Sequence, residues 1–420
     1  MDFLGKSFSY RQGSLYCGNT RLSDVADEVG TPCYLYSATD IVSRFNAYAA
    51  GLEGQRHRIC YAVKANSNLA VLGLLARAGA GFDIVSGGEL FRVLKAGGSA
   101  SAVVFSGVGK TADEIDYALR EGIHSFNCES EAELVLISSL AAHLGKRASV
   151  AVRVNPDVDA STHPYISTGL REHKFGIDIS EVQPVYERAR ALPGLILEGV
   201  SCHIGSQLLD AAPLVEAAGK MLALVDRLRS AGFPIRYFDL GGGLGVPYKP
   251  SDPRPDASAF LASVKQLIAG KDLSLLFEPG RSIVAEAGAL LSRVLYRKRN
   301  GDKEFIVIDA AMTELIRPAL YGAYHEIVPL RETTRPRVTA DVVGPVCETG
   351  DFLGQARPLC VQPGDLLAVM SAGAYGMAMA SNYNTRPRAV EVMVDGDAVH
   401  VIRQRETVAQ LYAGEQVLPV

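Results

Sequence analysis

The chain has 420 residues, of which 48% are hydrophobic and 21% charged, and its 42 Lys and Arg against 46 Asp and Glu give a formal net charge of −4. This composition is typical of a globular protein of about two large domains, and it excludes a disordered chain, a coiled coil and a collagen-like fibre. The near balance of charge, without a long basic run, argues against nucleic acid or an anionic membrane as a partner.

The cysteines and the chain start indicate the compartment. The 7 cysteines are scattered and contain no CxxC pair, which argues against a disulfide framework and against a zinc site, so no metal is expected. No apolar run reaches the roughly 18–20 residues that a bilayer span needs. The start, MDFLGKSFSY, lacks the basic and apolar regions of a secretion signal. We therefore expect a cytoplasmic protein.

A short apolar run, a turn and a longer amphipathic stretch recur between about residues 58 and 285. The runs lie at residues 58–65, 81–86, 103–107, 124–128, 149–156, 197–205, 235–243 and 273–280. Helix-like segments such as 68–79 and 214–232 separate them and end at Gly. Strands alternating with helices in this way predict an α/β fold, a (β/α)8 TIM-like barrel. A doubly wound sheet is the alternative.

The pattern changes after about residue 286. Runs such as EFIVIDA, PRVTADVVG and DLLAVMSAG are rich in β-branched residues and separated by turns. They predict an antiparallel β-sandwich or β-barrel domain. We therefore divide the chain into an N-terminal segment, 1–33, that joins the β domain, a barrel over 34–285 and a C-terminal β domain over 286–420.

A barrel of this kind carries its catalytic groups at the carboxyl ends of its strands. These ends hold Lys64, Asp83, Arg153, His203 and Glu278. Lys64 follows an apolar run, and a partly buried amine loses charge stabilisation, so its pKa falls and it can form a Schiff base. The alternative is an ordinary solvated lysine at the rim.

Glycines follow the last two strands, where barrels often bind phosphate. Gly241, Gly242 and Gly243 would let backbone amides approach an anion, although a flexible turn explains them equally well. Glu278 could face a heterocyclic nitrogen, or could form a salt bridge with Arg281. A Schiff-base lysine, a phosphate cradle and an acid for a ring nitrogen together describe a pyridoxal phosphate site.

Seven ordered motifs carry a resemblance to a known family over nearly the whole chain. They are YAVKANSN at Lys64, HIGSQ at 203–207, GGGLG at 241–245, EPGR at 278–281, RPALYGAYHEI at 317–327, VCETGD at 346–351 and SAGAYG at 371–376. The sequence resembles the diaminopimelate decarboxylases, pyridoxal phosphate-dependent enzymes of the alanine-racemase-like class (fold type III). The resemblance implies a barrel followed by a β domain, a pyridoxal 5'-phosphate cofactor and decarboxylation of meso-2,6-diaminopimelate to L-lysine and CO2.

The resemblance also implies roles for single residues. Lys64 would bind the cofactor as a Schiff base, His203 would stack on its ring, and Glu278 would bind its pyridine nitrogen. The remaining cofactor contacts implied are Asp83, Arg153, Ser206, Gly242, Gly243, Gly280, Arg281 and Tyr375. The substrate contacts implied are Arg281, Arg317, Tyr321, Glu348 and Tyr375.

Cys347 resembles a proton donor that the family supplies from the partner subunit, which implies a homodimer with shared active sites. From the residues alone, His203 could instead be a satisfied core histidine and Cys347 a small buried hydrophobe.

Two other functions stay open. One is a related decarboxylase that acts on ornithine, arginine, carboxynorspermidine or a carrier-bound amino acid. Ornithine-type relatives tend to have Cys-Asp where this chain has Cys347 and Glu348, and paired Arg281 and Arg317 suit a small-molecule amino acid with a distal carboxylate. The other is a non-catalytic pyridoxal phosphate carrier, which would need neither VCETGD nor SAGAYG.

Overall fold

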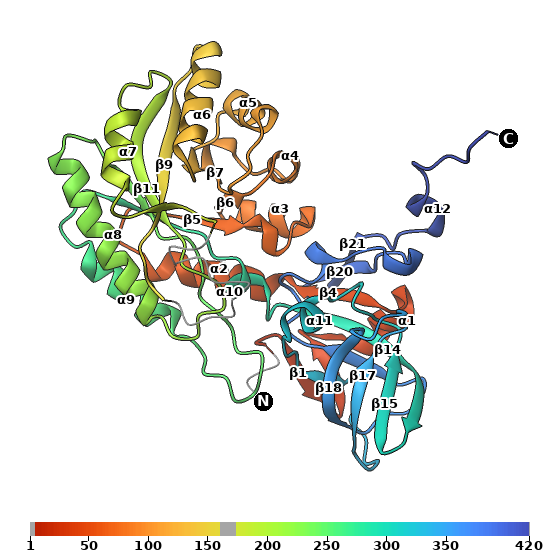
Figure 1. Cartoon of the computed structure of the whole chain (residues 1–420). Coiled ribbons are helices and arrows are strands. Elements are labelled where there is room, and N and C mark those ends of the chain that lie inside the picture. Colours follow the sequence, from red (N-terminus) through yellow and green to blue (C-terminus); the bar gives the residue numbers. More distant parts are fainter. Residues whose placement is uncertain (1–4, 160–173, 420) are drawn as a thin grey trace. The chain divides into compact units, whose positions relative to one another are not determined.

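The computed structural model describes residues 5–159 and 174–419 and divides into two compact units (Figure 1). The barrel unit comprises residues 42–246 and 253–282. The β unit comprises residues 1–41, 247–252 and 283–420. Each is described by itself below.

Within the described residues, eight parallel strands close into the barrel that the sequence predicts. They are β5 (His57–Ala62), β6 (Gly81–Ile84), β7 (Val103–Phe105), β8 (Ser125–Cys128), β9 (Ala148–Asn155), β11 (Leu195–Cys202), β12 (Tyr237–Asp239) and β13 (Ser274–Phe277). The ring closes because β13 pairs with β5 and β8 pairs with β9. A short strand, β10 (Ile177–Asp178), extends β9. The barrel is confirmed, and the doubly wound alternative is wrong.

Helices alternate with these strands and cover the outside of the barrel (Figure 1). They are α2 (Ala38–Gly51), α3 (Leu69–Arg77), α4 (Gly87–Lys95), α5 (Ala112–Glu121), α6 (Glu131–His143), α7 (Val182–Ala189), α8 (Ala212–Ser230) and α9 (Ala257–Leu267). Local sequence sets where they begin: Ser86, Thr111 and Ser130 each accept a hydrogen bond from the amide three residues later. Two of the predicted helical segments, 68–79 and 214–232, are α3 and α8.

The β unit is built on a mixed sheet. Its strands are β4 (Cys33–Ser37), β14 (Gly288–Asn300), β15 (Lys303–Ile308), β16 (Ile327–Pro329), β17 (Val338–Val343), β18 (Phe352–Leu359), β19 (Leu366–Val369), β20 (Val390–Asp395) and β21 (Ala398–Arg403). The sheet is not wholly antiparallel, because β15 pairs with β17 and β4 pairs with β20 in parallel. Residues 33–37 thus pair in this sheet, although 34–37 begin the range predicted for the barrel.

Smaller elements complete the β unit. A three-stranded sheet holds β1 (Phe8–Arg11), β2 (Ser14–Cys17) and β3 (Thr20–Arg21), and the short helices are α1 (Leu22–Val29), α11 (Arg317–Tyr321) and α12 (Val408–Leu411). The helix α10 (Arg281–Val284) follows the last barrel strand along the chain.

Each unit has its own apolar core. The barrel interior contains a cluster of Cys60, Val104, Ala151, Tyr237 and Leu276. In the β unit, residues of β2, β4, β14, β19 and β20 pack against α1 in a second cluster. Burial of this apolar surface is the main stabilising contribution to each unit.

Among the helices of the described residues, none combines the length and the apolar character that crossing a bilayer demands.

Glu406 ties the segment after β21 to the rest of the β unit. Its carboxylate accepts hydrogen bonds from Asn382 Nδ2 at 2.8 Å, from the Arg388 amide at 2.9 Å and from Arg388 Nη1 at 3.0 Å, and it also contacts Arg403. Burial acts in the opposite direction, but these contacts together lower the pKa of Glu406 to about 2.

We expect Glu406→Gln to lower the free energy of unfolding at pH 7 by about 1–3 kcal/mol, because the donors lose a charged acceptor. The pKa of Glu406 is about 4.5 in the unfolded chain and about 2 in the folded protein. Its ionised form therefore stabilises the fold fully above about pH 4.5, and this stabilisation is lost as the pH falls towards about 2. The difference in unfolding free energy between the variant and wild type should shrink over the same range. Urea titrations at pH 7 and pH 4 measure this difference in unfolding free energy, with the exposed Glu415→Gln as the control. A difference that grows on acidification would contradict this account.

Candidate active site

The carboxyl ends of the barrel strands bring the predicted residues together. Lys64, Arg153, His203 and Glu278 line one pocket of about 350 Å³, and Asp83 contacts Lys64. The other lining residues are Val85, Ser106, Gly107, Val108, Asn127, Phe175, Ser201 and Cys202. A pocket of this volume suits a small ligand or cofactor.

Lys64 lies in the short 3-10 helix that follows β5, and it forms an ion pair with Asp83 of β6. Its Nζ is 2.6 Å from Asp83 Oδ2. The Lys64 side chain is 36% exposed, whereas that of Asp83 is fully buried. The sequence analysis expected burial to lower the pKa of the Lys64 amine, and this stays a prediction. The fully buried Asp83 carboxylate lies within hydrogen-bond distance of that amine and therefore orients it.

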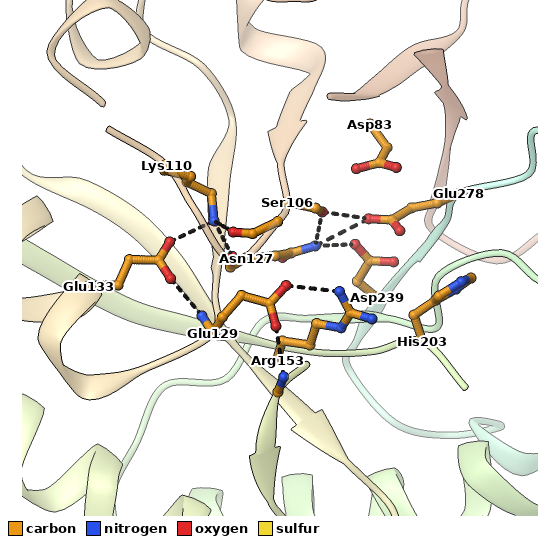
Figure 2. A network of polar contacts seen from close by, with 12 residues as sticks. Asp83, Ser106, Lys110, Asn127, Glu129, Glu133, Arg153, His203, Asp239 and Glu278 are labelled. Atoms are coloured by element: carbon orange, nitrogen blue, oxygen red, sulfur yellow. Dashed lines mark hydrogen bonds and ion pairs between the residues drawn. The ribbon is translucent and has the colours of Figure 1, made fainter. Parts of the chain in front are cut away.

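The buried carboxyl groups of Asp83, Asp239 and Glu278 lie in one cluster (Figure 2). Asn127 Nδ2 donates to Glu278 Oε1 and to Asp239 Oδ2, each at 3.1 Å. Burial, followed by the charges of Asp239 and Asp83, raises the pKa of Glu278 well above its usual value. Burial also raises the pKa of Asp239, although the Gly241 amide and Asn127 act in the opposite direction.

Two observations at this cluster show that its residues fit a cationic group. Within the described residues no ion pair joins Glu278 to Arg281, so the salt-bridge interpretation of Glu278 is wrong. Asp83 Oδ1 is buried without a hydrogen-bond partner in the described part of the chain. Buried carboxylates are costly unless a cation or donor balances them. The cluster would accommodate a protonated ring nitrogen.

His203 follows β11 and lines the pocket. Its Nδ1 accepts a hydrogen bond from the Gly242 amide at 3.3 Å. Burial, and then the charges of Arg153 and Lys64, lower the pKa of His203 well below its usual value. The imidazole is therefore neutral, and its flat ring can stack on an aromatic ligand without bringing a second charge.

The loops after β12 and β13 approach each other closely. A Cβ at Gly242 would lie 2.3 Å from the Glu278 carbonyl oxygen. Gly243 has φ +117, and a Cβ there would lie 2.7 Å from the Gly205 carbonyl oxygen. Only glycine fits at these two positions.

This pair of loops presents donors that suit a phosphate. The amides of Gly243 and Gly280 donate no hydrogen bond to any described residue. Ser206 Oγ accepts from Arg281 Nη2 at 3.1 Å and from Arg281 Nε at 3.3 Å. Free amides, a hydroxyl and a guanidinium are groups that bind phosphate. The observed residues therefore fit a phosphorylated cofactor.

A second layer, which the sequence analysis missed, holds Arg153 (Figure 2). Glu129 Oε1 accepts from Arg153 Nη1 at 2.8 Å, and Glu129 Oε2 accepts from the Gly176 amide at 2.7 Å. Glu133 accepts from the Glu129 amide and pairs with Lys110, whose side chain is 1% exposed. Ser106, Asn127 and Asp239 were missed as well. Ser106 follows β7, Asn127 is the last residue but one of β8 and Asp239 ends β12. Nearness to a strand end is their only sequence signal, and it does not distinguish them from other residues at these ends.

Arg317 and Tyr321 lie in α11 of the β unit. Arg317 is 5% exposed, and its guanidinium lies 4.4 Å from the ring centroid of Tyr248. Arg317 Nη1 is 2.7 Å from His325 Nε2, and His325 Nδ1 is 2.9 Å from the Met370 carbonyl oxygen. Nδ1 therefore carries the imidazole proton, and Nε2 accepts from Arg317. His325 is within the RPALYGAYHEI motif, but the sequence analysis gave it no role.

Cys347 and Glu348 lie in an exposed turn of the β unit between β17 and β18. Asp351 shapes this turn by accepting hydrogen bonds from the amides of Met312 at 2.6 Å and Val346 at 2.7 Å. The interpretation of Cys347 as a buried hydrophobe is wrong, because the residue is exposed.

Tyr375 also belongs to the β unit. It has φ +55, a left-handed conformation that a non-glycine residue rarely adopts. Such strained positions concentrate at functional sites.

Comparison with known proteins defines the class first. The model of the family described as "Pyridoxal-dependent decarboxylase, pyridoxal binding domain" matches residues 38–285. This is the segment that carries the pocket, and pyridoxal 5'-phosphate is the cofactor.

The wider comparison then defines the family. The chain is 55% identical to the diaminopimelate decarboxylase of Pseudomonas aeruginosa, over 98% of this chain and 99% of the relative. Two solved diaminopimelate decarboxylases, each in complex with L-lysine, have the same fold. The enzyme from Helicobacter pylori has a TM-score of 0.90 and 42% identity, over 94% of this chain and 99% of that one. The enzyme from M. jannaschii has a TM-score of 0.95 and 36% identity, over 99% of both chains. The chain belongs to the diaminopimelate decarboxylase family of pyridoxal-dependent decarboxylases.

The raised pKa of Glu278 predicts a pH-dependent cost to the protein without cofactor. Folded Glu278 keeps its proton above the unfolded pKa of about 4.5, so stability is lost as the pH rises from there towards the folded pKa. Glutamine cannot ionise and avoids this loss. We expect the Glu278→Gln apoprotein to melt at least about 2 °C above wild type at pH 8, with a smaller difference at pH 5.

Thermal unfolding followed by circular dichroism measures the melting temperatures of variant and wild type at pH 8 and at pH 5. Glu216→Gln, at a 58% exposed side chain of α8, is the control and should not change the pH dependence. A variant that melts below wild type at pH 8 would show that an ionised Glu278 stabilises the empty pocket.

Proposed function

We propose that this enzyme decarboxylates meso-2,6-diaminopimelate to L-lysine and CO2, the last step of lysine biosynthesis, with pyridoxal phosphate bound to Lys64 as a Schiff base. One observation carries the proposal: a single pocket combines the Lys64–Asp83 pair with the buried acid Glu278. The names of the relatives at 44–55% identity, and the L-lysine bound in two of the solved neighbours, support the substrate.

When bound, pyridoxal phosphate supplies a ring that accepts the electron pair left at Cα as CO2 departs. Glu278 would lie against the pyridine nitrogen and keep a proton there, because a buried carboxylate with a raised pKa is strongly stabilised by a cationic neighbour. His203 stacks on the ring. Asp83 and Arg153 orient the groups around Lys64.

The phosphate is bound by groups from several loops. These are Ser206, Gly242, Gly243, Gly280, Arg281 and Tyr375. The two glycines whose amides are free supply donors, and Arg281 supplies a positive charge through a side chain that Ser206 already orients.

The substrate differs from a simple amino acid by its second amino-acid end. Arg281, Arg317, Tyr321 and Tyr375 bind its carboxylates and the adjoining chain, and Glu348 binds the distal end. Arg317 suits a carboxylate because its guanidinium is buried and is oriented by the His325 imidazole. A substrate that lacks the distal carboxylate, such as ornithine, could not make this contact.

The enzyme acts as a homodimer whose partner subunit supplies Cys347. The Cys347 thiol donates the proton that replaces CO2 at Cα, as a general acid. Its exposure supports this role, because a buried thiol could not reach a site on another chain.

The substrate is tested by CO2 release from meso-, LL- and DD-diaminopimelate, ornithine and arginine. We expect release from the meso isomer and none from ornithine or arginine. Lys64→Ala should release none, whereas a surface variant, Lys298→Ala, retains full activity. Borohydride reduction and peptide mapping should find the cofactor on Lys64. Faster release from ornithine or arginine would favour the related decarboxylases, and a label on another lysine would refute the role of Lys64.

The shared site is tested by mixing inactive Lys64→Ala subunits with inactive Cys347→Ala subunits. After random reassortment half of the dimers are mixed and each has one intact site of two, so about a quarter of wild-type activity should return. Tagged subunits verify the exchange. If exchanged dimers stay inactive, Lys64 and Cys347 act within one chain.

A further inference from the structure

The β unit has a pocket of its own, of about 390 Å³, that includes none of the residues assigned above to cofactor or substrate. Much of its wall is apolar, and two acids and two arginines complete it. The lining residues are Tyr10, Pro250, Tyr324, Glu326, Ile327, Val328, Pro329, Glu332, Thr333, Arg337, Arg357, Pro358, Leu359 and Cys360.

Arg357 is the unusual member of this wall. It is 7% exposed, and its guanidinium carbon lies 3.5 Å from the ring centroid of Tyr324. The guanidinium makes no hydrogen bond or ion pair with any described residue, and Nε is sealed from solvent without a partner. The stacked ring offsets part of the cost of burying this cation, but it leaves every N–H donor unused.

Arg357 belongs to the strand β18, so regular strand pairing fixes its backbone. Arg357 and Leu359 lie two residues apart in β18, so both side chains are on its buried face. An apolar side chain is usual at such a position. A bulge precedes it, since the pairing of β18 with β17 shifts between Ala340 and Val342. At the bulge Ala356 has φ +49, and its amide donates to Asp341 Oδ1 at 2.8 Å. Bulges of this kind re-aim side chains next to binding sites.

The charges around Arg357 define what the pocket would bind. A guanidinium with free donors matches a carboxylate, which it can bind through two parallel hydrogen bonds. Glu326, which accepts from the Tyr324 hydroxyl at 2.5 Å, and Glu332 repel any anion, and they repel a doubly charged phosphate more strongly than a singly charged carboxylate. The prolines, Ile327 and Leu359 would take up an apolar body.

We propose that this pocket binds a small monocarboxylate with an apolar body, through a bidentate contact of its carboxylate with Arg357. The site is separate from the residues of the reaction, and the proposal does not depend on which amino acid the enzyme decarboxylates.

Saturation-transfer NMR on the cofactor-loaded enzyme at pH 7.5 tests this with 4-methylpentanoate, phenylacetate, 4-methylpentanamide and, by competition, inorganic phosphate. We expect both carboxylates to bind at least about tenfold more tightly than the amide, because the amide lacks the charge that Arg357 pairs with. Phosphate should not displace them. Added salt should weaken binding of the carboxylates.

Matched variants locate the binding. Arg357→Gln should weaken carboxylate binding at least about tenfold, and Arg357→Lys, which keeps the charge but not the planar fork, should fall between it and wild type. Arg299→Gln, at a 62% exposed side chain of the same unit, should leave binding unchanged, and so should Arg281→Gln in the barrel unit. Thermal unfolding verifies that each variant is folded.

Several outcomes would overturn the proposal. They are no carboxylate binding to wild type, equal binding of the amide, displacement by phosphate, or retention in Arg357→Gln with loss in Arg281→Gln, which would place the ligand in the barrel. If Arg357→Gln does not fold, the comparison of carboxylate with amide and the Arg357→Lys variant still decide the question.

Discussion

Buried negative charge at the carboxyl ends of the barrel strands is the constraint on which the rest of the active site depends. Asp83 and Asp239 are fully buried and Glu278 is 8% exposed. Like charges this close cannot all ionise in a low-dielectric interior without compensating cations. Lys64 compensates Asp83, and Asn127 joins the other two by hydrogen bonds. Burial and the neighbouring carboxyl groups raise the pKa of Glu278, so a cationic group beside it would stabilise its ionised form.

The surrounding ion pairs follow from that constraint. Arg153 and Lys110 each need a buried carboxylate, and Glu129 and Glu133 supply them. Buried pairs contribute little net stability because desolvation offsets their attraction. Their contribution here is geometric: Glu129 connects Arg153 to the Gly176 amide, so one carboxylate positions a pocket wall and a loop together. A neutral His203 adds no further charge to this balance.

The sequence predicted the parts of this arrangement that depend on local pattern. Alternating apolar runs located all eight barrel strands, and strand ends located Lys64, His203 and Glu278, since a strand end is a position along the chain. Asn127, Asp239 and Glu129 could not be singled out, because their importance lies in contacts between strands far apart in sequence. The parallel pairing of β4 with β20 escaped for the same reason, as it joins residues 33–37 to 390–394. The sequence analysis described Lys64 by its apolar neighbours in the chain, and its contact with Asp83 on the next strand could not be read from that pattern.

Two buried arginines of the β unit differ in the contacts that orient their guanidinium groups. Arg317 and Arg357 both lie against a tyrosine ring, at 4.4 and 3.5 Å. Arg317 also contacts His325, whose own proton is fixed by a backbone carbonyl, so its orientation is set before any ligand binds. Arg357 lies against the ring and near the charge of Glu326, but no described residue accepts a hydrogen bond from it. A buried guanidinium that already has an acceptor is oriented before a ligand binds, whereas one without an acceptor is stabilised by a ligand that supplies one. The reasoning that supports our proposal of a substrate contact for Arg317 therefore also supports our proposal of a ligand for Arg357.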